Sequence, residues 1–285
     1  MTHETSTLQP TACTTVTFYY SINRSMAAKE LEEKSYVQSR REFDSEGRVI
    51  SQITYRQDGK EVERETFTFD ETGFLIEETK RTQDEDFTER IKHEKGGNDQ
   101  KAFSYRYYAD GSFDTTTYTY DDQDRLVELR TADSDDEEEV KEVYEYPEAG
   151  LQLSERYDWE ELSGKRSIRT GEHGMVERKV TDAEGDVMEL LQLEYNDAGK
   201  LVASTLEEDG ERYEIKYELD DQGRPVKELH NSNDNNFQQT ITNQFDDNGH
   251  LIHQQQLVNE NGKEIRFARR YDYEWPEEGS QNSGA

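Results

Sequence analysis

Paired carboxylates are the residues of this sequence whose types and spacing could support acid–base catalysis or bind a metal ion. Asp121-Asp122, Asp220-Asp221 and Asp246-Asp247 each follow a segment with the pattern of a strand. A catalytic pair needs two different environments to separate the pKa values of its carboxyl groups, whereas a repeated position supplies the same environment each time. An Asp at such a position accepts backbone N–H bonds and begins a turn. We therefore interpret these pairs as turn residues and expect no catalytic residue among them.

Metal ligands are the second chemistry to consider. The acidic loop at residues 131–139, with Asp133 to Glu139 at its centre, offers oxygen ligands of the kind that calcium prefers. No window has the EF-hand spacing, with glycine at the sixth and glutamate at the twelfth position. His250 and His253 are close in sequence, but their spacing places them on opposite faces of a strand. We expect no metal site and no cofactor, with loose cation binding by the acidic loop as the alternative.

A row of cations follows the turn glycines, and one cysteine is present. The cations are Arg48, Arg125, Lys200, Arg224 and His250. Pairing with the Asp of the same turn is the simple explanation for the row, and a ligand-binding row is the alternative. Cys13 has no positioned partner, and no phosphate loop, nucleophile elbow or HExxH motif is present. The sequence therefore predicts a protein that is not an enzyme.

Turns recur along the chain and indicate how these residues are positioned. The main turns centre on Gly47, Gly73, Gly97, Asp124, Gly150, Gly174, Gly199, Gly223 and Gly249. A second turn falls about halfway through each ~25-residue period, most clearly at Gly59, Gly111, Gly185, Gly210 and Gly262. Asp-Gly between alternating segments is a strong hairpin signal, and legs of ~12 residues are too short for a βαβ crossover. We predict an all-β antiparallel β-meander of about nine two-strand repeats, which amounts to roughly eighteen strands.

The alternation of residues indicates one apolar and one charged face. Tyr213, Ile215 and Tyr217 share one face, while Glu214 and Lys216 share the other. A flat layer would leave a large exposed apolar strip, so we predict a curved or spiral sheet, formed as a spiral, a rolled sheet or an open barrel. A single layer whose rings are covered by lysine and glutamate stems is the alternative.

The domain organisation follows from these patterns. We predict a disordered N-terminus at residues 1–13, a single β-repeat domain at 14–275 and a disordered tail at 276–285. Strong helix formers at about 25–34 predict one short helix, which would cap the first edge of the repeat array.

The segment Tyr120-Asp-Asp-Gln-Asp-Arg-Leu-Val resembles the YD repeats of Rhs- and teneurin-type proteins, and similar segments begin at residues 195 and 245. The resemblance extends over about residues 36–275 and implies β-hairpin repeats that wind into a spiralling sheet. The repeats of this chain are longer than usual for that family, and Phe or Leu often replaces Tyr. No toxin or protease-like module follows the last repeat, so the toxin-encapsulating role of Rhs proteins is not carried over.

Charge sets the expectations about partners. The formal net charge is -32, with 66 acidic and 34 basic residues. Such a chain repels phosphate backbones and favours a basic partner, so we expect a protein partner with a basic surface and no nucleic acid. A single cysteine fits a reducing compartment, and no signal peptide or membrane-spanning stretch is evident, so we expect a cytoplasmic protein with no membrane partner.

The predicted function is a non-enzymatic interaction or scaffold protein. An extended repeat surface offers a large contact area without a pocket, and analogy with YD-repeat proteins favours an inhibitor, immunity or adaptor protein of a bacterial conflict or defence system. The alternative is a carbohydrate- or surface-binding repeat module, which requires aromatic rings on an exposed face.

Overall fold

The structure, a computed structural model, is built from strands. It describes residues 9–20, 35–83, 88–233, 237–260 and 263–276. Within these residues there is no α-helix, and the one helical element is a 3-10 turn, η1 (Gly97–Asp99). No helix in this part of the chain is long and apolar enough to cross a membrane.

The strands are, in chain order, β1 (Ala12–Tyr20), β2 (Tyr36–Phe43), β3 (Val49–Tyr55), β4 (Glu61–Phe69), β5 (Leu75–Thr82), β6 (Thr88–Lys95), β7 (Lys101–Tyr107), β8 (Phe113–Tyr120), β9 (Leu126–Ala132), β10 (Glu138–Glu148), β11 (Leu151–Asp158), β12 (Glu161–Gly171), β13 (Gly174–Asp182), β14 (Val187–Tyr195), β15 (Leu201–Glu208), β16 (Glu211–Leu219), β17 (Pro225–Ser232), β18 (Phe237–Phe245), β19 (Leu251–Glu260) and β20 (Lys263–Glu274).

The turn between β16 and β17 shows why these residues form hairpins. The N–H of Asp220 donates to the carbonyl of Arg224 at 3.0 Å, and the N–H of Gly223 donates to the carbonyl of Asp220 at 2.9 Å. Gly223 has a φ of +77°, and a Cβ there would lie 2.8 Å from the Cε of Lys200. Glycine alone adopts this backbone without a steric cost. The turn therefore ends one strand and returns the chain antiparallel to it.

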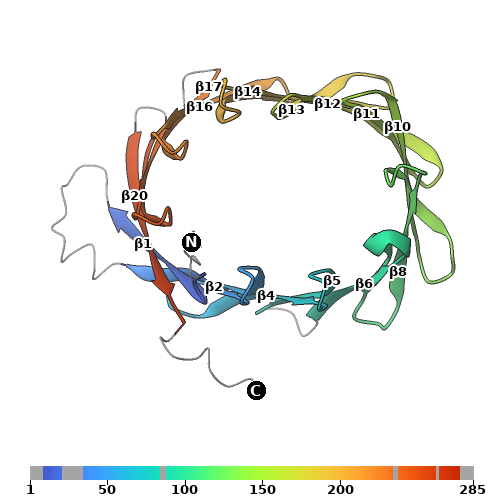
Figure 1. Ribbon diagram of the computed structural model, residues 1–285, viewed down its shortest axis with the longest axis horizontal. Coiled ribbons are helices and arrows are strands. Elements are labelled where there is room, and N and C mark those ends of the chain that lie inside the picture. The colour runs from blue at the N-terminus through green and yellow to red at the C-terminus, as the bar shows by residue number, and fades with distance from the viewer. Residues whose placement is uncertain (1–8, 21–34, 84–87, 234–236, 261–262, 277–285) are drawn as a thin grey trace, which may run out of the picture. The chain divides into compact units, whose positions relative to one another are not determined.

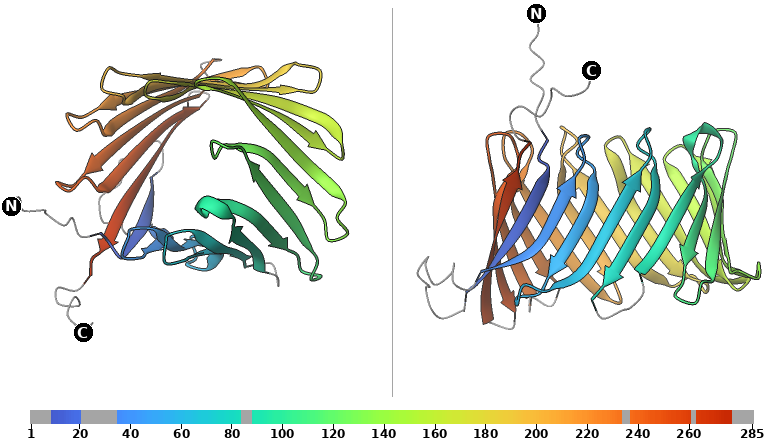
Figure 2. Two further views of the ribbon diagram at one scale, coloured as in Figure 1. Left: turned by 45° about the vertical axis from the view of Figure 1, so that its right-hand side comes forward. Right: turned by 90° about the horizontal axis from the view of Figure 1, so that it is seen from below.

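The chain divides into two compact units. Unit 1 consists of Met1–Ile91, Phe245–Gln254 and Phe267–Ala285, and unit 2 consists of Lys92–Gln244 and Gln255–Arg266. In unit 2, each strand from β7 to β18 pairs antiparallel with the next one along the chain. In unit 1, β2 to β5 form the same meander, as Figure 2 shows in its view from below.

The sheet is closed, which corrects the predicted curved or spiral meander of nine repeats. Within unit 1, β1 pairs with β2 on one side and with β20 on the other (Figure 1). The N–H of Thr11 donates to the carbonyl of Glu274 at 2.8 Å, and the guanidinium of Arg40 forms an ion pair with the Glu274 carboxylate at 2.5 Å. Closure pairs the backbone groups that a free edge strand would expose.

The strand count and the beginning of the first strand also differ from what the repeats suggested. The described residues form twenty strands instead of roughly eighteen, because β1 and β20 complete the sheet outside the regular periods. β1 begins at Ala12, two residues before the predicted domain start at Thr14. The predicted helix at about 25–34 falls in residues 21–34, which lie outside the described part of the chain.

Burial is shallow throughout the described residues. The buried apolar side chains are few, among them Ala12, Ile53 and Ile241, and no large side chain is fully buried. The strands in extensive contact are hydrogen-bonded neighbours, and buried polar groups such as Ser104 and Asn243 lie among the apolar ones. The backbone ladder and many half-buried cross-strand contacts therefore stabilise this fold, because each burial contributes in proportion to the apolar area removed from water.

Candidate functional site

The aspartate pairs that could have been catalytic are turn residues in the structure. The Oδ1 of Asp121 accepts hydrogen bonds from the N–H groups of Gln123 (2.9 Å) and Arg125 (3.0 Å), and its Oδ2 accepts from the Nε of Arg125 (2.7 Å). Asp220 makes the same three contacts in its turn. The hydrogen bond from the Arg125 side chain lowers the pKa of Asp121. The first Asp of each pair is therefore held as a charged turn cap, which does not suit a proton-transferring group.

The row of cations is explained in part by pairing within the turn. Arg48, Arg125 and Arg224 each form an ion pair with the Asp four residues earlier, and His250 contacts Asp246 at 3.0 Å. Lys200 follows Asn196 instead of an Asp, and its side chain lies against the turn glycine Gly223 of the next repeat.

The same cations also connect one repeat to the next. The guanidinium of Arg48 lies 4.7 Å from the ring centre of Phe69, and that of Arg125 lies 4.5 Å from the ring centre of Tyr146. A cation over an aromatic ring is attracted by the negative face of the ring. These contacts hold successive turns together, so the row has a structural role and the ligand-binding alternative gains no support from it.

Sequence reasoning missed a second connection between repeats, made by tyrosine hydroxyl groups. Each such hydroxyl donates to a backbone carbonyl at the start of the strand that directly precedes its own strand: Tyr120 to Lys101 (3.0 Å), Tyr146 to Leu126 (2.8 Å), Tyr195 to Met175 (2.9 Å) and Tyr273 to Leu251 (3.0 Å). Burial raises the pKa of Tyr146, so its hydroxyl keeps its proton. The signal was present in the sequence as tyrosine instead of phenylalanine before the turn, but we interpreted both as apolar positions.

The predicted metal-binding candidates do not come together. In the described ranges, no three His, Cys, Asp or Glu side chains are placed to share a metal ion. His250 contacts Asp246 and the ring of Trp275, whose centre is 5.0 Å away, while burial lowers the pKa of His253. In the acidic loop, Asp133 caps the turn through the N–H groups of Asp135 and Glu137.

Two nucleophilic side chains are positioned without a reaction site around them. Cys13 is half-buried in β1, and burial raises the pKa of its thiol, which keeps it in the less reactive thiol form. Ser104 lies 2.8 Å from the Nδ1 of His93 and 3.3 Å from the hydroxyl of Tyr118. Ser104 and His93 are both buried and lie in neither of the two hollows described below, so the geometry supports a buried hydrogen-bonded network.

An acidic edge is a charged feature of unit 2. We define it as the four turns at residues 133–137, 158–161, 182–186 and 208–211, each of which has three or four carboxylates and no lysine or arginine. These turns leave alternate strands (β9, β11, β13 and β15), so in an antiparallel meander they lie at one edge of the sheet. Arg130 pairs with Asp136 and Arg156 with Asp158.

Most carboxylates of the acidic edge are exposed and unneutralised. Asp135, Glu160, Glu184 and Asp209 have no ion pair with any described residue. Trp159 is 60% exposed at the tip of the turn between β11 and β12. The opposite edge differs, because its turns at 121–125 and 220–224 contain arginines that pair with their own aspartates.

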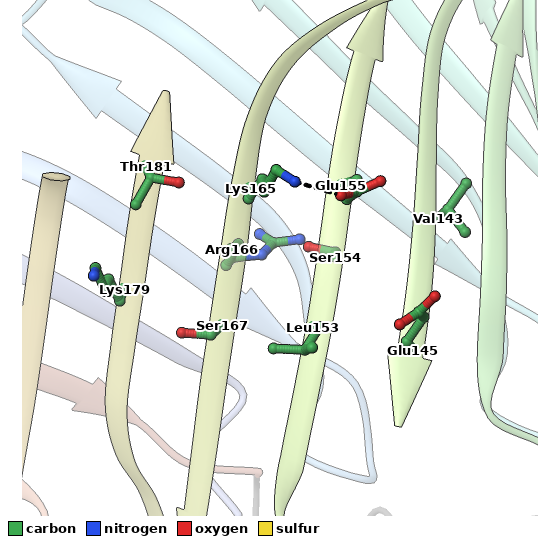
Figure 3. A pocket seen from close by; sticks show the side chains of 10 residues that line it. All are labelled: Val143, Glu145, Leu153, Ser154, Glu155, Lys165, Arg166, Ser167, Lys179 and Thr181. Atoms are coloured by element: carbon green, nitrogen blue, oxygen red, sulfur yellow. Dashed lines mark hydrogen bonds and ion pairs between the residues drawn. The ribbon is translucent and has the colours of Figure 1, made fainter. Parts of the chain in front are cut away.

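An open hollow crosses strands β10 to β13 in the same unit (Figure 3). It has a volume of about 360 Å³, and its lining includes Val143, Glu145, Leu153, Lys165 and Lys179. The Nζ of Lys165 donates to a carboxylate oxygen of Glu155 at 2.7 Å. A second hollow of about 380 Å³ lies over the same strands and is lined in part by Glu142, Arg156 and Arg166.

Groups around the second hollow satisfy one another. The Glu142 carboxylate accepts hydrogen bonds from the hydroxyl of Tyr144 (2.5 Å), from Arg156 (3.2 Å) and from Arg166 (3.1 Å). Burial, followed by the hydrogen bond to Glu142, raises the pKa of Tyr144. This arrangement is a cross-strand network in which Glu142 pairs with two arginines. The first hollow is instead lined by Glu145 and Lys179, which form no ion pair with a described residue.

An exposed aromatic cluster lies on β7 and β8. The ring centres of Phe103 and Tyr105 are 6.3 Å apart, and the ring of Phe113 lies 6.1 Å from Tyr105 and 5.8 Å from Tyr107. Phe103 and Phe113 are each 37% exposed. We call Phe103, Tyr105, Tyr107 and Phe113 the aromatic cluster.

Comparisons with known proteins identify no family. No family model matches the chain, and no curated protein matches it. Among solved structures, a porin-like protein from Bacteroides uniformis is similar at 9% identity and a TM-score of 0.39, covering 93% of this chain and 98% of that one. A porin-like protein from Bacteroides vulgatus is similar at 10% identity and a TM-score of 0.33, covering 93% and 98%.

A structure of TcdB2-TccC3 without its hypervariable C-terminal region is also similar, at 12% identity and a TM-score of 0.37. The match covers 93% of this chain and 18% of that one, so this chain corresponds to a small part of that protein.

Proposed function

We propose that this protein is a non-enzymatic interaction protein that binds a protein partner with a basic surface. The acidic edge is the observation that carries the proposal. Several of its exposed carboxylates, such as Glu184 and Asp209, form no ion pair with a described residue. Turn formation does not require them, because Asp133 and Asp182 already cap two of these turns.

Charge and exposed apolar area are combined at this edge. A surface with one sign of charge attracts a partner of the opposite sign and speeds their association. Trp159 is 60% exposed, and Val187 and Met188, which follow the third acidic turn, are 53% and 45% exposed. Tryptophan is enriched among the residues that dominate binding energy at interfaces. The edge therefore offers both steering by charge and apolar anchors.

The turns support a relation to YD repeats as part of the same proposal. Tyr120, Asp121 and Arg125 act together, since the tyrosine hydroxyl binds the preceding repeat, the Asp caps the turn and the Arg pairs with the Asp. An inhibitor, immunity or adaptor protein of a bacterial conflict system, acting in the cytoplasm, is the version of the function that this resemblance favours.

Affinity capture from a native lysate tests the proposal with matched charge reversals. One variant combines Glu184→Lys and Asp209→Lys at the acidic edge, and the control combines Asp122→Lys and Asp221→Lys at the opposite edge. All four side chains are exposed. We expect a basic protein to be captured by the wild type and by the control, to be lost with the acidic-edge variant, and to be released as salt is raised. Equal capture by both variants would rule out the acidic edge as the binding surface.

A second candidate function is carbohydrate binding, which the aromatic cluster favours. Its rings lie together on one strand pair, where Thr115 and Thr117 of β8 are the cross-strand partners of Tyr105 and Phe103. Aromatic faces provide large apolar contact with some polar specificity. A glycan array separates the two candidates: binding that is lost in a Phe103→Ala, Phe113→Ala double variant supports carbohydrate recognition, and the absence of glycan binding removes this candidate.

A further inference from the structure

The hollow over β10 to β13 has a charge arrangement that the proposed protein-binding function does not use. Glu145, Leu153, Ser167 and Lys179 are successive cross-strand partners and form one row across four strands. Figure 3 shows Glu145 and Lys179 at opposite sides of the hollow, with Leu153 and Ser167 between them. Residues directly opposite one another on neighbouring strands share a face of the sheet.

The charged side chains between the two ends of this hollow are paired. Lys165 and Glu155 lie in the next row and form an ion pair at 2.7 Å. Neither Glu145 nor Lys179 forms an ion pair with any residue that the structure describes. Arg166 also lines the hollow, and its guanidinium forms an ion pair with Glu142 at 3.1 Å. The hollow therefore presents one unpaired carboxylate at one end and one unpaired ammonium group at the other, with paired charges between them.

We propose that this hollow binds a short extended peptide of about three residues with free ends, its amino group at Glu145 and its carboxylate at Lys179. Opposite charges at the two ends of the site match the zwitterion of such a peptide, whereas a purely anionic or purely cationic ligand would meet one like charge.

Length supports this ligand class. Three strand spacings separate the Cα atoms of Glu145 and Lys179, which corresponds to about 14 Å. Both side chains can lean toward the centre, and an extended chain of three residues spans roughly 10 Å. The hollow volume of about 360 Å³ is within the range of small-ligand sites.

The floor of the hollow sets a preference for the middle residue of the peptide. Leu153 lies in the row between the two charges, and Val143 lines the same hollow. An apolar side chain at the centre of the ligand would cover this surface and remove apolar area from water. The hydroxyl of Ser167 is in the same row and is available to a backbone group of the peptide.

Calorimetric titration with the tripeptide Ala-Leu-Ala tests the proposal, using the full-length protein at low salt. Two blocked forms of this peptide probe the two charges separately. One has an acetylated amino end and a free carboxylate, and the other has a free amino end and an amidated carboxyl end. The protein variants are Glu145→Gln and Lys179→Met. Their controls are Glu194→Gln, which also precedes a turn tyrosine, and Lys216→Met, an exposed lysine on β16.

We expect the wild type and both controls to bind the free tripeptide, and each site variant to bind it ~5-fold more weakly, as is typical of partly exposed ion pairs. Lys179→Met should not weaken binding of the amidated peptide further, and Glu145→Gln should not weaken binding of the acetylated one, because the matching charge is already absent. The proposal is overturned if the wild type shows no binding at millimolar peptide, or if a site variant weakens the free and the matching blocked peptide equally.

Discussion

Replacement of Tyr146 by phenylalanine tests whether the tyrosine hydroxyls hold successive repeats together. The change removes the hydrogen bond of 2.8 Å to the carbonyl of Leu126 and the longer one, 3.4 Å, that the hydroxyl accepts from the Nε2 of Gln152. It keeps the ring on which Arg125 lies. A phenylalanine ring fits at this repeat position, since the equivalent residue of an earlier repeat is Phe69. The variant therefore isolates the hydroxyl from the packing of the aromatic side chain.

The size of the effect follows from the geometry of the bond. An intramolecular hydrogen bond contributes a net ~1 kcal/mol to the free energy of unfolding, and an unpaired carbonyl in a dry site adds further cost. The Tyr146 hydroxyl and its acceptor are partly buried, so water can reach the freed carbonyl and the cost stays near ~1 kcal/mol. For a chain of this size, that loss corresponds to a decrease of about 2 °C in the midpoint of thermal unfolding.

Urea unfolding followed by circular dichroism measures this difference. The control is Tyr157→Phe, because the Tyr157 hydroxyl donates to Glu155 within the same strand and connects no repeats. We expect Tyr146→Phe to be less stable than this control, with an unchanged dependence of the unfolding free energy on urea. Equal stability of the two variants would falsify the view that these hydroxyls connect the repeats.

Three further outcomes follow from the turns and the acidic edge. Asp121→Asn keeps an oxygen for the backbone N–H groups and loses the charge that Arg125 binds. The pKa of Asp121 is lowered in the folded state. The stability that its charge contributes is therefore present above pH ~3.9 and is lost as pH falls through the folded pKa. The two proteins should therefore differ in urea stability at pH 7 and converge at strongly acidic pH. Gly150→Ala should destabilise more than Gly59→Ala: both have positive φ, which costs alanine ~1 kcal/mol, but a Cβ at Gly150 would lie 2.5 Å from the carbonyl oxygen of Thr170. Thermal unfolding compares the two. Trp159→Ala should change the unfolding free energy by less than ~0.5 kcal/mol, because the side chain is mostly exposed, yet should weaken capture of the partner by the acidic edge.

Local chemistry explains which parts of the fold were predictable. Hairpin turns were identified correctly at Gly47, Gly59 and Gly223, because positive φ requires glycine or a tolerant residue at a fixed place in the turn. The turn role of Asp121 could be predicted for the same reason, since the contacts involved span four residues or fewer. These features depend on neighbours along the chain, and the sequence displays such neighbours directly.

Closure of the sheet could not be predicted in this way. Pairing of β1 with β20 joins residues such as Thr11 and Glu274, which are 263 positions apart. The repeat pattern describes the contacts of each strand with the next one and contains no signal for the pairing of the two ends. The hollow over β10 to β13 could not be predicted for the same reason, because Glu145 and Lys179 lie in one row only through three successive strand pairings.

The sequence by itself determined the strands, the turns, the antiparallel order and the acidic character of this protein. These follow from residue alternation, turn chemistry and composition, which act over short distances. The tertiary structure alone decided that the sheet closes through β1 and β20, that the tyrosine hydroxyls bind the preceding repeats, and that the acidic turns of unit 2 form one edge. Register and strand pairing control these features, because a shift of one residue moves every side chain of a strand to the other face.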